Sequence, residues 1–543
     1  MKKPFFSILL PVYKTPLHFL NECLETIAQQ TFKDFELIIV DDASPRPEIA
    51  NCLNTWKKRD SRSTVLVRQS NGGIVAASND ALHVAQGEFC VLVDHDDLLE
   101  PDALELIWNE IQRYEDVDYL YTDEYHLLPD GSTHDFRKPS WSPERFRSQM
   151  YTCHISVIRT NLMREVGGFF DGYDGAQDYD LILRVTERAR RISHIPVSLY
   201  YWRVNPESFS RQSETKDKSF DSGRRAVQAH CDRLGIDAVV EFTQTDGIYR
   251  VRRRLKSAPL VSVVIPSCGS GGYAWGVYRT FLIECLRTMH SKSTYKNLQF
   301  VIVLDRITPP KVVDELHELQ IENLKIVWYD RPFNFSDKTN MGVVHADGEY
   351  VLLLNDDTEI IDHDWCESML SLLEDQSVGA VGTLLYFSDQ SVQHAGHRYV
   401  DGNPTHVGFK SVFNNGGAFG ELGCQREVSG VTAAALMTNR ETFLRIGGMS
   451  NEFPNNYNDV DFCMKLRNSG FSILYTPFAS MYHFESQSRD PQIDEEEHDN
   501  ILRRWWRELH NDRFDAPIAE EQVGRQKALW RRKPKYTPTN YKS

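Results

Sequence analysis

The chain alternates short apolar runs with longer segments of helical periodicity. The runs SILL, ELIIV and FCVLV in the first half and SVVI, FVIV and YVLLL in the second are rich in Val, Ile and Leu, which is typical of strands buried on both faces. Segments 17–29, 49–59 and 103–114 repeat their apolar residues with a helical period. This alternation predicts an α/β fold with a mostly parallel sheet. In such sheets ligands bind beyond the carboxyl ends of the strands.

The same pattern occurs twice, in the same order. FSILLPVY (6–13), ELIIVDD (36–42) and NDALHVAQGEFCVLVDHDD (79–97) correspond to VSVVIPSC (261–268), QFVIVLD (299–305) and NMGVVHADGEYVLLLNDD (340–357). A repeat of roughly 260 residues is too long for a solenoid, so it indicates two copies of one large domain. We expect the copies at 1–213 and 258–490. Between them, 214–257 reads as a helix and a hairpin, and 491–543 reads as an amphipathic helix and a basic tail.

The amino-acid composition argues against several classes of protein. The 543 residues include 61 basic and 77 acidic ones, for a net charge of −16, which argues against non-specific binding to a nucleic-acid backbone. The ten cysteines form no C-x-x-C pair, so we expect buried thiols in a reducing compartment rather than a disulfide framework or a zinc ribbon. No apolar run approaches the ~18 residues of a membrane span, and no secretory signal is recognisable. We therefore expect a cytoplasmic protein.

Acidic residues follow the buried strands in both copies. The second strand of copy one runs into Asp41 and Asp42, and a later strand runs into the segment 94–97, which reads DHDD. Copy two repeats the arrangement with Asp305 and with the segment 355–357, which reads NDD. Clustered carboxylates repel one another, and a divalent cation bound with a diphosphate relieves that repulsion. Asp is also common in turns, but the occurrence at equivalent places in a repeat favours the metal–diphosphate interpretation.

A third acidic block opens an apolar helix in each copy, as QDYD at 177–180 and NDVD at 458–461. An Asp at such a place can simply cap the helix. The first Asp of each block, Asp178 and Asp459, also suits a general base that takes a proton from a hydroxyl group. His483 follows a strand-like segment, Ser472 to Thr476, and is a candidate metal ligand.

Together these motifs resemble the family 2 glycosyltransferases with the nucleotide-diphospho-sugar (GT-A) fold. The resemblance covers about residues 1–210 and 257–490. In copy two, PFNFSDKTNMG, LLLNDDTEI, SVQHAGH, VTAAALMTNRETF, NDVDFCMKLRNSG and YHFESQSR resemble the rhamnosyltransferase-like enzymes of bacterial O-antigen and capsule assembly. Copy one, with DHDDLLEPDAL, YTDE, QDYDLILRV and IPVSLYYWR, resembles the domain that precedes it in tandem members.

The resemblance implies roles for individual residues. Those implied to bind the nucleotide-sugar are Pro11, Tyr13, Asp42, Asp94, Pro266, Ser267, Asp305 and Asn355. Those implied to bind the metal are Asp96, Asp357 and His483, and those implied as catalytic bases are Asp178 and Asp459. Copy one departs from the pattern because Tyr201 and Asn205 stand where related domains often carry His. Its metal site is therefore expected to lack an imidazole.

The resemblance thus implies a bifunctional, metal-dependent inverting glycosyltransferase that uses Mn²⁺ or Mg²⁺. The implied donors are UDP- or dTDP-sugars, and the implied acceptor is a growing bacterial surface polysaccharide, lipid-linked at the cytoplasmic face of the inner membrane. The basic tail would contact that membrane. Two alternatives stay open. Copy one could be an acceptor-binding or scaffold module without activity, or the chain could be a nucleotidyltransferase-like protein that binds sugar nucleotides.

Overall fold

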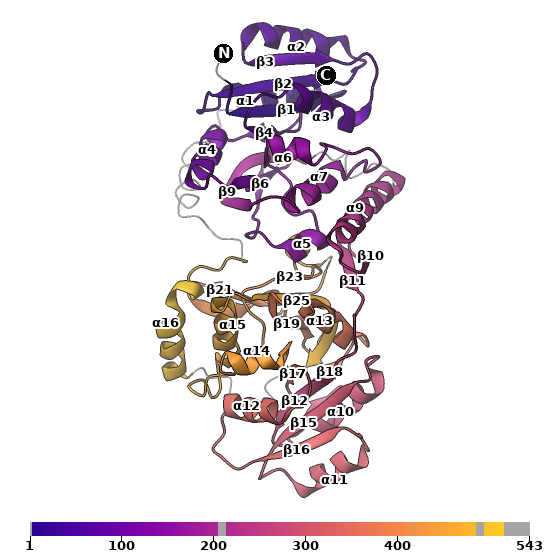
Figure 1. Ribbon diagram of the computed structural model, residues 1–543, viewed down its shortest axis with the longest axis vertical. Helices are drawn as coiled ribbons and strands as arrows, with labels where there is room; N and C mark the ends of the chain where they lie inside the picture. Colours follow the sequence, from indigo (N-terminus) through magenta and orange to yellow (C-terminus); the bar gives the residue numbers. More distant parts are fainter. Residues whose placement is uncertain (1–2, 205–212, 415, 485–493, 515–543) are drawn as a thin grey trace. The chain divides into compact units, whose positions relative to one another are not determined.

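The computed structural model describes residues 3–204, 213–414, 416–484 and 494–514, and its contacts divide the chain into two compact units (Figure 1). Within the described residues, unit 1 comprises 3–141 and 150–234, and unit 2 comprises 142–149 and 235–514. The division at Leu234 falls inside the segment 214–257 that separates the sequence repeats. Its helix belongs to unit 1 and its hairpin to unit 2.

Unit 1 is built on one mixed sheet with the strand order β3-β2-β1-β4-β8-β6-β9-β5. Its strands are β1 (Phe6–Val12), β2 (Phe35–Asp41), β3 (Ser63–Val67), β4 (Phe89–Leu92), β5 (Leu98–Leu99), β6 (Val117–Leu127), β7 (Thr133–Phe136), β8 (Ser156–Arg159) and β9 (Arg191–Arg203). Its helices are α1 (Leu17–Ala28), α2 (Pro47–Arg59), α3 (Gly73–Val84), α4 (Ala103–Arg113), α6 (Thr160–Glu165), α7 (Gln177–Thr186) and α9 (Ser213–Leu234). The first four strands of the sheet order are parallel, and β8 is antiparallel to both β4 and β6.

Unit 2 repeats this order as β16-β15-β12-β17-β24-β19-β25-β18. Its strands are β10 (Ala238–Phe242), β11 (Tyr249–Arg253), β12 (Val261–Ser267), β13 (Gly271–Ala274), β14 (Val277–Thr280), β15 (Leu298–Asp305), β16 (Leu324–Tyr329), β17 (Tyr350–Leu354), β18 (Thr358–Ile360), β19 (Val378–Tyr386), β20 (Val392–His394), β21 (His397–Val400), β22 (Asn403–His406), β23 (Arg426–Glu427), β24 (Ala435–Asn439) and β25 (Ser472–His483). Its helices are α5 (Pro143–Ser148), α10 (Phe281–Lys292), α11 (Pro310–Glu318), α12 (Phe335–His345), α13 (Trp365–Leu373), a short 3₁₀ turn η1 (Ala418–Gly420), α14 (Arg440–Arg445), α15 (Asn458–Asn468) and α16 (Glu495–Leu509). The identical strand order confirms that the sequence repeat encodes two copies of one α/β fold.

The apolar runs form strands buried on both faces, as their composition predicts. In β12, Val263 and Ile265 belong to one core cluster, and Val264 between them belongs to another. Neighbouring strands divide in the same way, with Ile302 on the side of Val263 and Val303 on the side of Val264. Because side chains alternate along a strand, one continuous apolar run supplies two cores.

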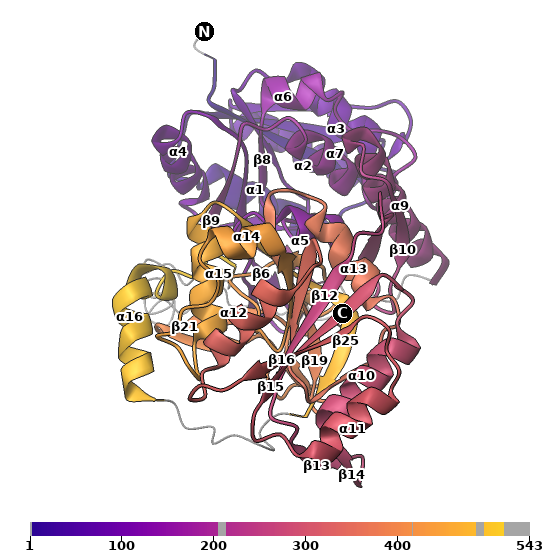
Figure 2. The same ribbon diagram turned by 60° about the horizontal axis from the view of Figure 1, so that its bottom comes forward.

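Three further expectations concern the ends of the chain, its cysteines and membrane spans. The predicted C-terminal helix is α16, which packs against α15 through Ile501, Leu509 and Trp505 (Figure 2). The basic tail, 525–543, lies outside the described residues. All ten cysteines are free, and seven of them are buried. Among the described residues, no helix combines the length and apolar character that crossing a bilayer requires.

A buried carboxylate pair makes the stability of unit 2 sensitive to pH. Burial and the nearby Glu144 raise the pKa of Glu427 to about 7, while Arg253 and Arg147 outweigh burial and lower the pKa of Glu144 to about 2. The backbone N–H of Glu144 donates to Glu427 Oε2 at 3.2 Å. A raised folded-state pKa contributes stability that is complete below the unfolded value of 4.5 and is lost as pH rises through about 7.

Glu427→Gln is therefore expected to raise the unfolding temperature of unit 2 at pH 8, because the amide cannot ionise beside Glu144. The gain should be on the order of 1–3 kcal/mol and should vanish near pH 5. Calorimetry of the full chain at pH 5, 6.5 and 8 measures this gain in the free energy of unfolding. Glu322→Gln, in an exposed turn, is the control. An equal effect of Glu427→Gln at all three pH values would contradict the assignment.

Candidate functional site

In unit 2 the carboxyl ends of the parallel strands bring polar groups to one edge of the sheet. Ser267 ends β12 and Asp305 ends β15. The buried Lys338, in α12, donates from Nζ to the carbonyl of Ser267 at 3.1 Å and pairs with Asp305 Oδ2 at 3.0 Å. Ser267 Oγ donates to Asp356, whose pKa burial and the neighbouring Asp357 raise to about 7. This edge therefore holds one ammonium group among several carboxylates.

The expected metal ligands Asp357 and His483 lie together. Thr358 of β18 pairs with His483 of β25, which places His483 Nε2 3.1 Å from Asp357 Oδ1. Asn355 Nδ2 also lies 3.1 Å from His483 Nε2. On the other side of the ring, Nδ1 lies 2.7 Å from Gln393 Oε1. Since the Nδ1 proton is donated to Gln393, a neutral ring turns the lone pair of Nε2 toward the carboxylate.

This donor set fits a divalent cation. The Nε2 lone pair accepts from Asn355 Nδ2, and Asp357 Oδ1 lies at the same distance from it, so a cation there would be bound by the ring nitrogen and the carboxylate in place of the Asn355 contact. Few protein ligands leave room for phosphate oxygens. A small pocket beside Asp357 is also lined by Arg279, Phe281 and Phe484.

The expected base Asp459 lies in the first turn of α15 and is connected to the same edge. Its Oδ2 accepts the backbone N–H of Ala433 at 3.1 Å, and its Oδ1 accepts that of Val460 at 2.8 Å. The carbonyl of Ala434, the residue after Ala433, accepts the backbone N–H of Asn355 at 3.1 Å. Ala433 and Ala434 therefore link Asp459, the expected base, to Asn355, the expected ribose-binding residue.

Unit 1 places its predicted residues at the corresponding edge, but with different partners. Pro11 lies in β1, and Tyr13 follows that strand. Asp42 is 2% exposed and accepts the backbone N–H groups of Gly72 and Gly73 at 2.9 and 2.8 Å. Arg68 Nε lies 3.0 Å from the same carboxylate. Asp42 therefore organises the start of α3 in this structure.

The expected lack of an imidazole in unit 1 does not hold for the edge as a whole. His154, just before β8, places Nε2 3.3 Å from Asp94 Oδ2. Asp94, Asp97 and His154 offer ligand atoms within 4.8 Å of one another. The expected ligand Asp96 is about one-third exposed, and His95 Nδ1 lies 3.5 Å from its Oδ1. Asn205 lies outside the described residues.

Asp178, the expected base of unit 1, lies in the first turn of α7. Burial raises its pKa, Asp94 adds to the rise, and the backbone N–H of Tyr179 and the nearby His154 oppose it. Asp178 therefore lies near enough to Asp94 and His154 for their charges to act on it. A carboxyl group with a raised pKa is a stronger proton acceptor when ionised.

Comparison with known proteins identifies the family. The model named Glycosyl transferase family 2 matches residues 7–165 and 262–426, which is more than half of the chain and includes both copies. The chain belongs to glycosyl transferase family 2. The expected fold and the tandem arrangement are confirmed by this double match together with the two equivalent sheets.

Two curated relatives extend over most of this glycosyltransferase chain. The uncharacterized protein y4gI of Sinorhizobium fredii is 33% identical over 92% of this chain and 56% of its own length. The O-antigen biosynthesis protein RfbC of Myxococcus xanthus is 32% identical over 90% of this chain and 38% of its own length. The chain thus spans about half or less of the length of these relatives.

Solved structures show more distant similarity to this family 2 chain. Staphylococcus aureus TarS 1–349 in complex with UDP-GlcNAc is 22% identical, with a TM-score of 0.36 over 42% of this chain and 66% of that chain. The mannosyltransferase PcManGT of Pyrobaculum calidifontis in complex with GDP-Man and Mn²⁺ is 18% identical, with a TM-score of 0.34 over 43% and 64%.

Sequence reasoning assigned no role to several residues at these two edges: Lys338 and Gln393 in unit 2, and His154 in unit 1. Asp356 was identified only as part of the acidic segment 355–357. Gln393 lies 90 residues from its partner His483. The segment SVQHAGH contains Gln393 and was recognised only as part of the family resemblance. A useful signal would have been that metal-binding His residues usually donate their second ring N–H to an oxygen acceptor.

Gln393→Leu is expected to weaken divalent-cation binding at Asp357 and His483 by about 10–100-fold, because the imidazole loses the acceptor that fixes its orientation. The Mn²⁺ concentration that half-saturates binding, followed by electron paramagnetic resonance, measures this. Gln376→Leu changes the same residue type at an exposed turn and should leave Mn²⁺ binding unchanged. Equal Mn²⁺ affinity in both variants would show that Gln393 does not orient a ligand.

Proposed function

We propose that the chain is a bifunctional, inverting glycosyltransferase that transfers sugars from nucleotide diphospho-sugars to a growing bacterial surface polysaccharide. The observation that carries the proposal is the arrangement in unit 2. There Asp357 Oδ1 and His483 Nε2 lie 3.1 Å apart, and Asp459 is connected to the neighbouring Asn355 through residues 433–434. A diphosphate site beside one further carboxylate is what an inverting sugar transfer needs.

On the donor side, the proposed nucleotide-sugar residues are Pro266, Ser267, Asp305 and Asn355 in unit 2, and Pro11, Tyr13, Asp42 and Asp94 in unit 1. Asp357 with His483, or Asp96 in unit 1, would hold Mn²⁺ or Mg²⁺, which when bound neutralises the diphosphate and so stabilises the leaving group. Asn355 and Asp305 orient the ribose and the base. UDP- and dTDP-sugars are the proposed donors.

On the acceptor side, Asp459 or Asp178 takes the proton of the attacking hydroxyl group. That hydroxyl approaches the anomeric carbon from the face opposite the diphosphate, so the configuration inverts and no covalent sugar–enzyme intermediate forms. The hydrogen bonds from the backbone of Ala433 and Val460 hold the Asp459 carboxylate in place. Each carboxylate oxygen has a second lone pair with which to accept a proton.

The relatives' names support the substrate class. RfbC of M. xanthus is named for O-antigen biosynthesis, and a chondroitin synthase of Pasteurella multocida is 30% identical over 34% of this chain. We propose a lipid-linked glycan acceptor at the cytoplasmic face of the inner membrane, with contact through the C-terminal tail. Unchanged co-sedimentation with vesicles after deletion of 525–543 would remove the tail from this proposal.

A specific observation favours a second candidate, in which unit 1 binds the acceptor or acts as a scaffold. Asp42 is saturated by hydrogen bonds and by Arg68, and Asp94 is paired with His154. Asp42 is also more enclosed than its counterpart Asp305, since their side chains are 3% and 17% exposed.

A screen of nucleotide sugars with Mn²⁺ or Mg²⁺ tests the proposed function. The full chain is incubated with each donor and with lipid-linked glycan acceptors, and the released products are identified. Release of a nucleoside diphosphate together with an extended glycan is expected. Release of pyrophosphate would instead indicate a nucleotidyltransferase, and binding without any release would indicate a sugar-nucleotide-binding protein.

A further inference from the structure

Three histidines of unit 2 converge at a place that the proposed donor site does not use. His394 ends β20, and His397 and His406 lie directly opposite each other on the antiparallel strands β21 and β22. Gly396 has a φ of +100°, and this turn places His394 and His397 on the same side of the segment. Each ring offers one nitrogen, and the three nitrogens lie within 4.8 Å of one another.

The three rings are buried or nearly so, and they are neutral. His394 is 1% exposed and His397 is 5% exposed. Burial lowers the pKa of all three rings, and for His394 and His406 the neighbouring rings lower it further, to about 4 for His406. Neutral imidazole is the form that binds transition metals.

Two of the rings already share a position that a cation can occupy. His394 Nδ1 lies 2.6 Å from His406 Nδ1. His394 Nε2 accepts the backbone N–H of Thr432 at 3.2 Å, so the proton of the neutral ring is on Nδ1 and is donated to His406. A cation bound by both Nδ1 atoms would take the place of this hydrogen bond. The His394 ring would stay neutral by carrying its proton on Nε2, which would then give up the hydrogen bond from Thr432.

The third ring, His397, differs from the other two in its hydrogen bonding. Neither ring nitrogen of His397 makes a hydrogen bond within the described part of the chain, and its Nδ1 is buried. Its nearest charged group is Asp459, whose Oδ2 lies 3.9 Å from Nε2. A buried polar ring without a hydrogen bond is destabilising, and a ligand bound by the ring would offset this.

We infer that His394, His397 and His406 form a second metal site, for a transition cation such as Zn²⁺, separate from the site at Asp357 and His483. The donor chemistry separates the two sites. Three imidazoles suit Zn²⁺, whereas carboxylate and amide oxygens with one imidazole suit Mn²⁺ or Mg²⁺. Three protein ligands leave a fourth position open to an outside ligand.

The open fourth coordination position of this metal bears on how the acceptor binds. Because Asp459 lies beside His397, a cation in the cluster is next to the group proposed as the general base, where it can bind the acceptor hydroxyl. This consequence rests on the proposed function, but the metal site itself does not. Metal binding can therefore be tested without any donor or acceptor.

The test uses the full chain after removal of metals with a chelator. Zn²⁺ is titrated in competition with a chromogenic chelator, and Co²⁺ is added separately to record its visible absorption. We expect about one equivalent of tightly bound Zn²⁺ and the intense visible bands of four-coordinate Co²⁺. His406→Gln, at the least buried ring, should weaken Zn²⁺ binding at least about 100-fold and remove the Co²⁺ bands. His394→Gln should do the same.

Two controls separate this site from others. His345→Gln changes a histidine at the exposed end of α12 and should leave Zn²⁺ binding intact. Asp357→Asn disrupts the donor-side cation site and should also leave it intact. Absence of tight Zn²⁺ binding in the unmodified chain would overturn the inference, as would binding lost in Asp357→Asn but kept in His406→Gln. Circular dichroism establishes that each variant is folded.

Discussion

Asp459→Asn is expected to lower the turnover of the sugar transfer carried out by unit 2 by about 10²–10⁴-fold, because the amide cannot accept the proton of the acceptor hydroxyl. Donor binding should change little, since Asp459 lies on the acceptor side. The hydrogen bond from Ala433 can be retained by the amide oxygen of Asn, so the variant should keep its fold. Steady-state transfer to a defined acceptor gives kcat, and calorimetric titration of the donor gives its Kd.

Asp401→Asn removes the same charge at an exposed turn of unit 2 and should retain full activity. Asp178→Asn, assayed with its own acceptor, addresses unit 1 separately. Loss of one linkage in each variant supports two activities. If Asp178→Asn changes neither linkage, unit 1 is the acceptor-binding or scaffold module. Full turnover of Asp459→Asn would refute the assignment of the base.

Much of the fold could be predicted from local patterns. The run SILL forms part of β1, and the helices expected at 17–29, 49–59 and 103–114 are Leu17–Ala28, Pro47–Arg59 and Ala103–Arg113. These elements depend on periodicity and propensity, which are local. The antiparallel placement of β8 and β24 inside each sheet could not be read in this way, because it depends on pairing between strands far apart in the chain.

The candidate site also combines residues that local motifs indicate with partners that they do not. Asp357 and Asp459 stand in recognisable local motifs. Their partners come from elsewhere, as Lys338 does for Asp305 and Gln393 does for His483. Asp42 also stands in a recognisable motif, but that motif does not reveal that its oxygens accept hydrogen bonds from residues 71–73. Sequence motifs indicate which chemistry is present, but the contacts of a side chain follow from the folded backbone.

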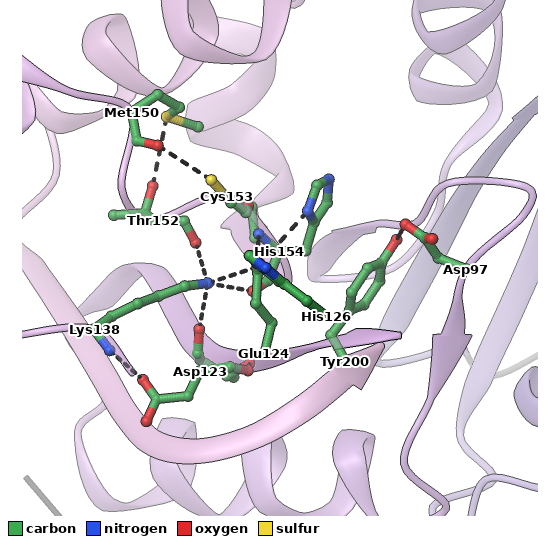
Figure 3. A network of polar contacts seen from close by, with 12 residues as sticks. Asp97, Asp123, Glu124, His126, Lys138, Met150, Thr152, Cys153, His154 and Tyr200 are labelled. Carbon is green, nitrogen blue, oxygen red and sulfur yellow. Dashed lines mark hydrogen bonds and ion pairs between the residues drawn. The ribbon is translucent and has the colours of Figure 1, made fainter. Parts of the chain in front are cut away.

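Lys138 in unit 1 is a buried ion that no sequence motif marks. Its ammonium group is fully buried, donates to the carbonyls of Thr122 and Thr152 at 2.8 Å, and pairs with Glu124 at 2.9 Å (Figure 3). It also donates to the carbonyl of His154. Lys138, His126 and His154 outweigh the effect of burial and hold the pKa of Glu124 well below its usual range. The ammonium thus supports the segment from which His154 reaches Asp94.

Lys138→Met is therefore expected to destabilise unit 1 by about 3–5 kcal/mol, because it leaves Glu124 charged and without its buried cation. Adding Glu124→Gln should restore part of this loss, since the uncompensated charge is then removed. Hydrogen exchange of peptides from β6 and β8 reports on unit 1 alone. Lys57→Met, at an exposed position of α2, is the control. A loss below about 1 kcal/mol would show that the pair contributes no more than a surface salt bridge and that His154 is held in place by other contacts.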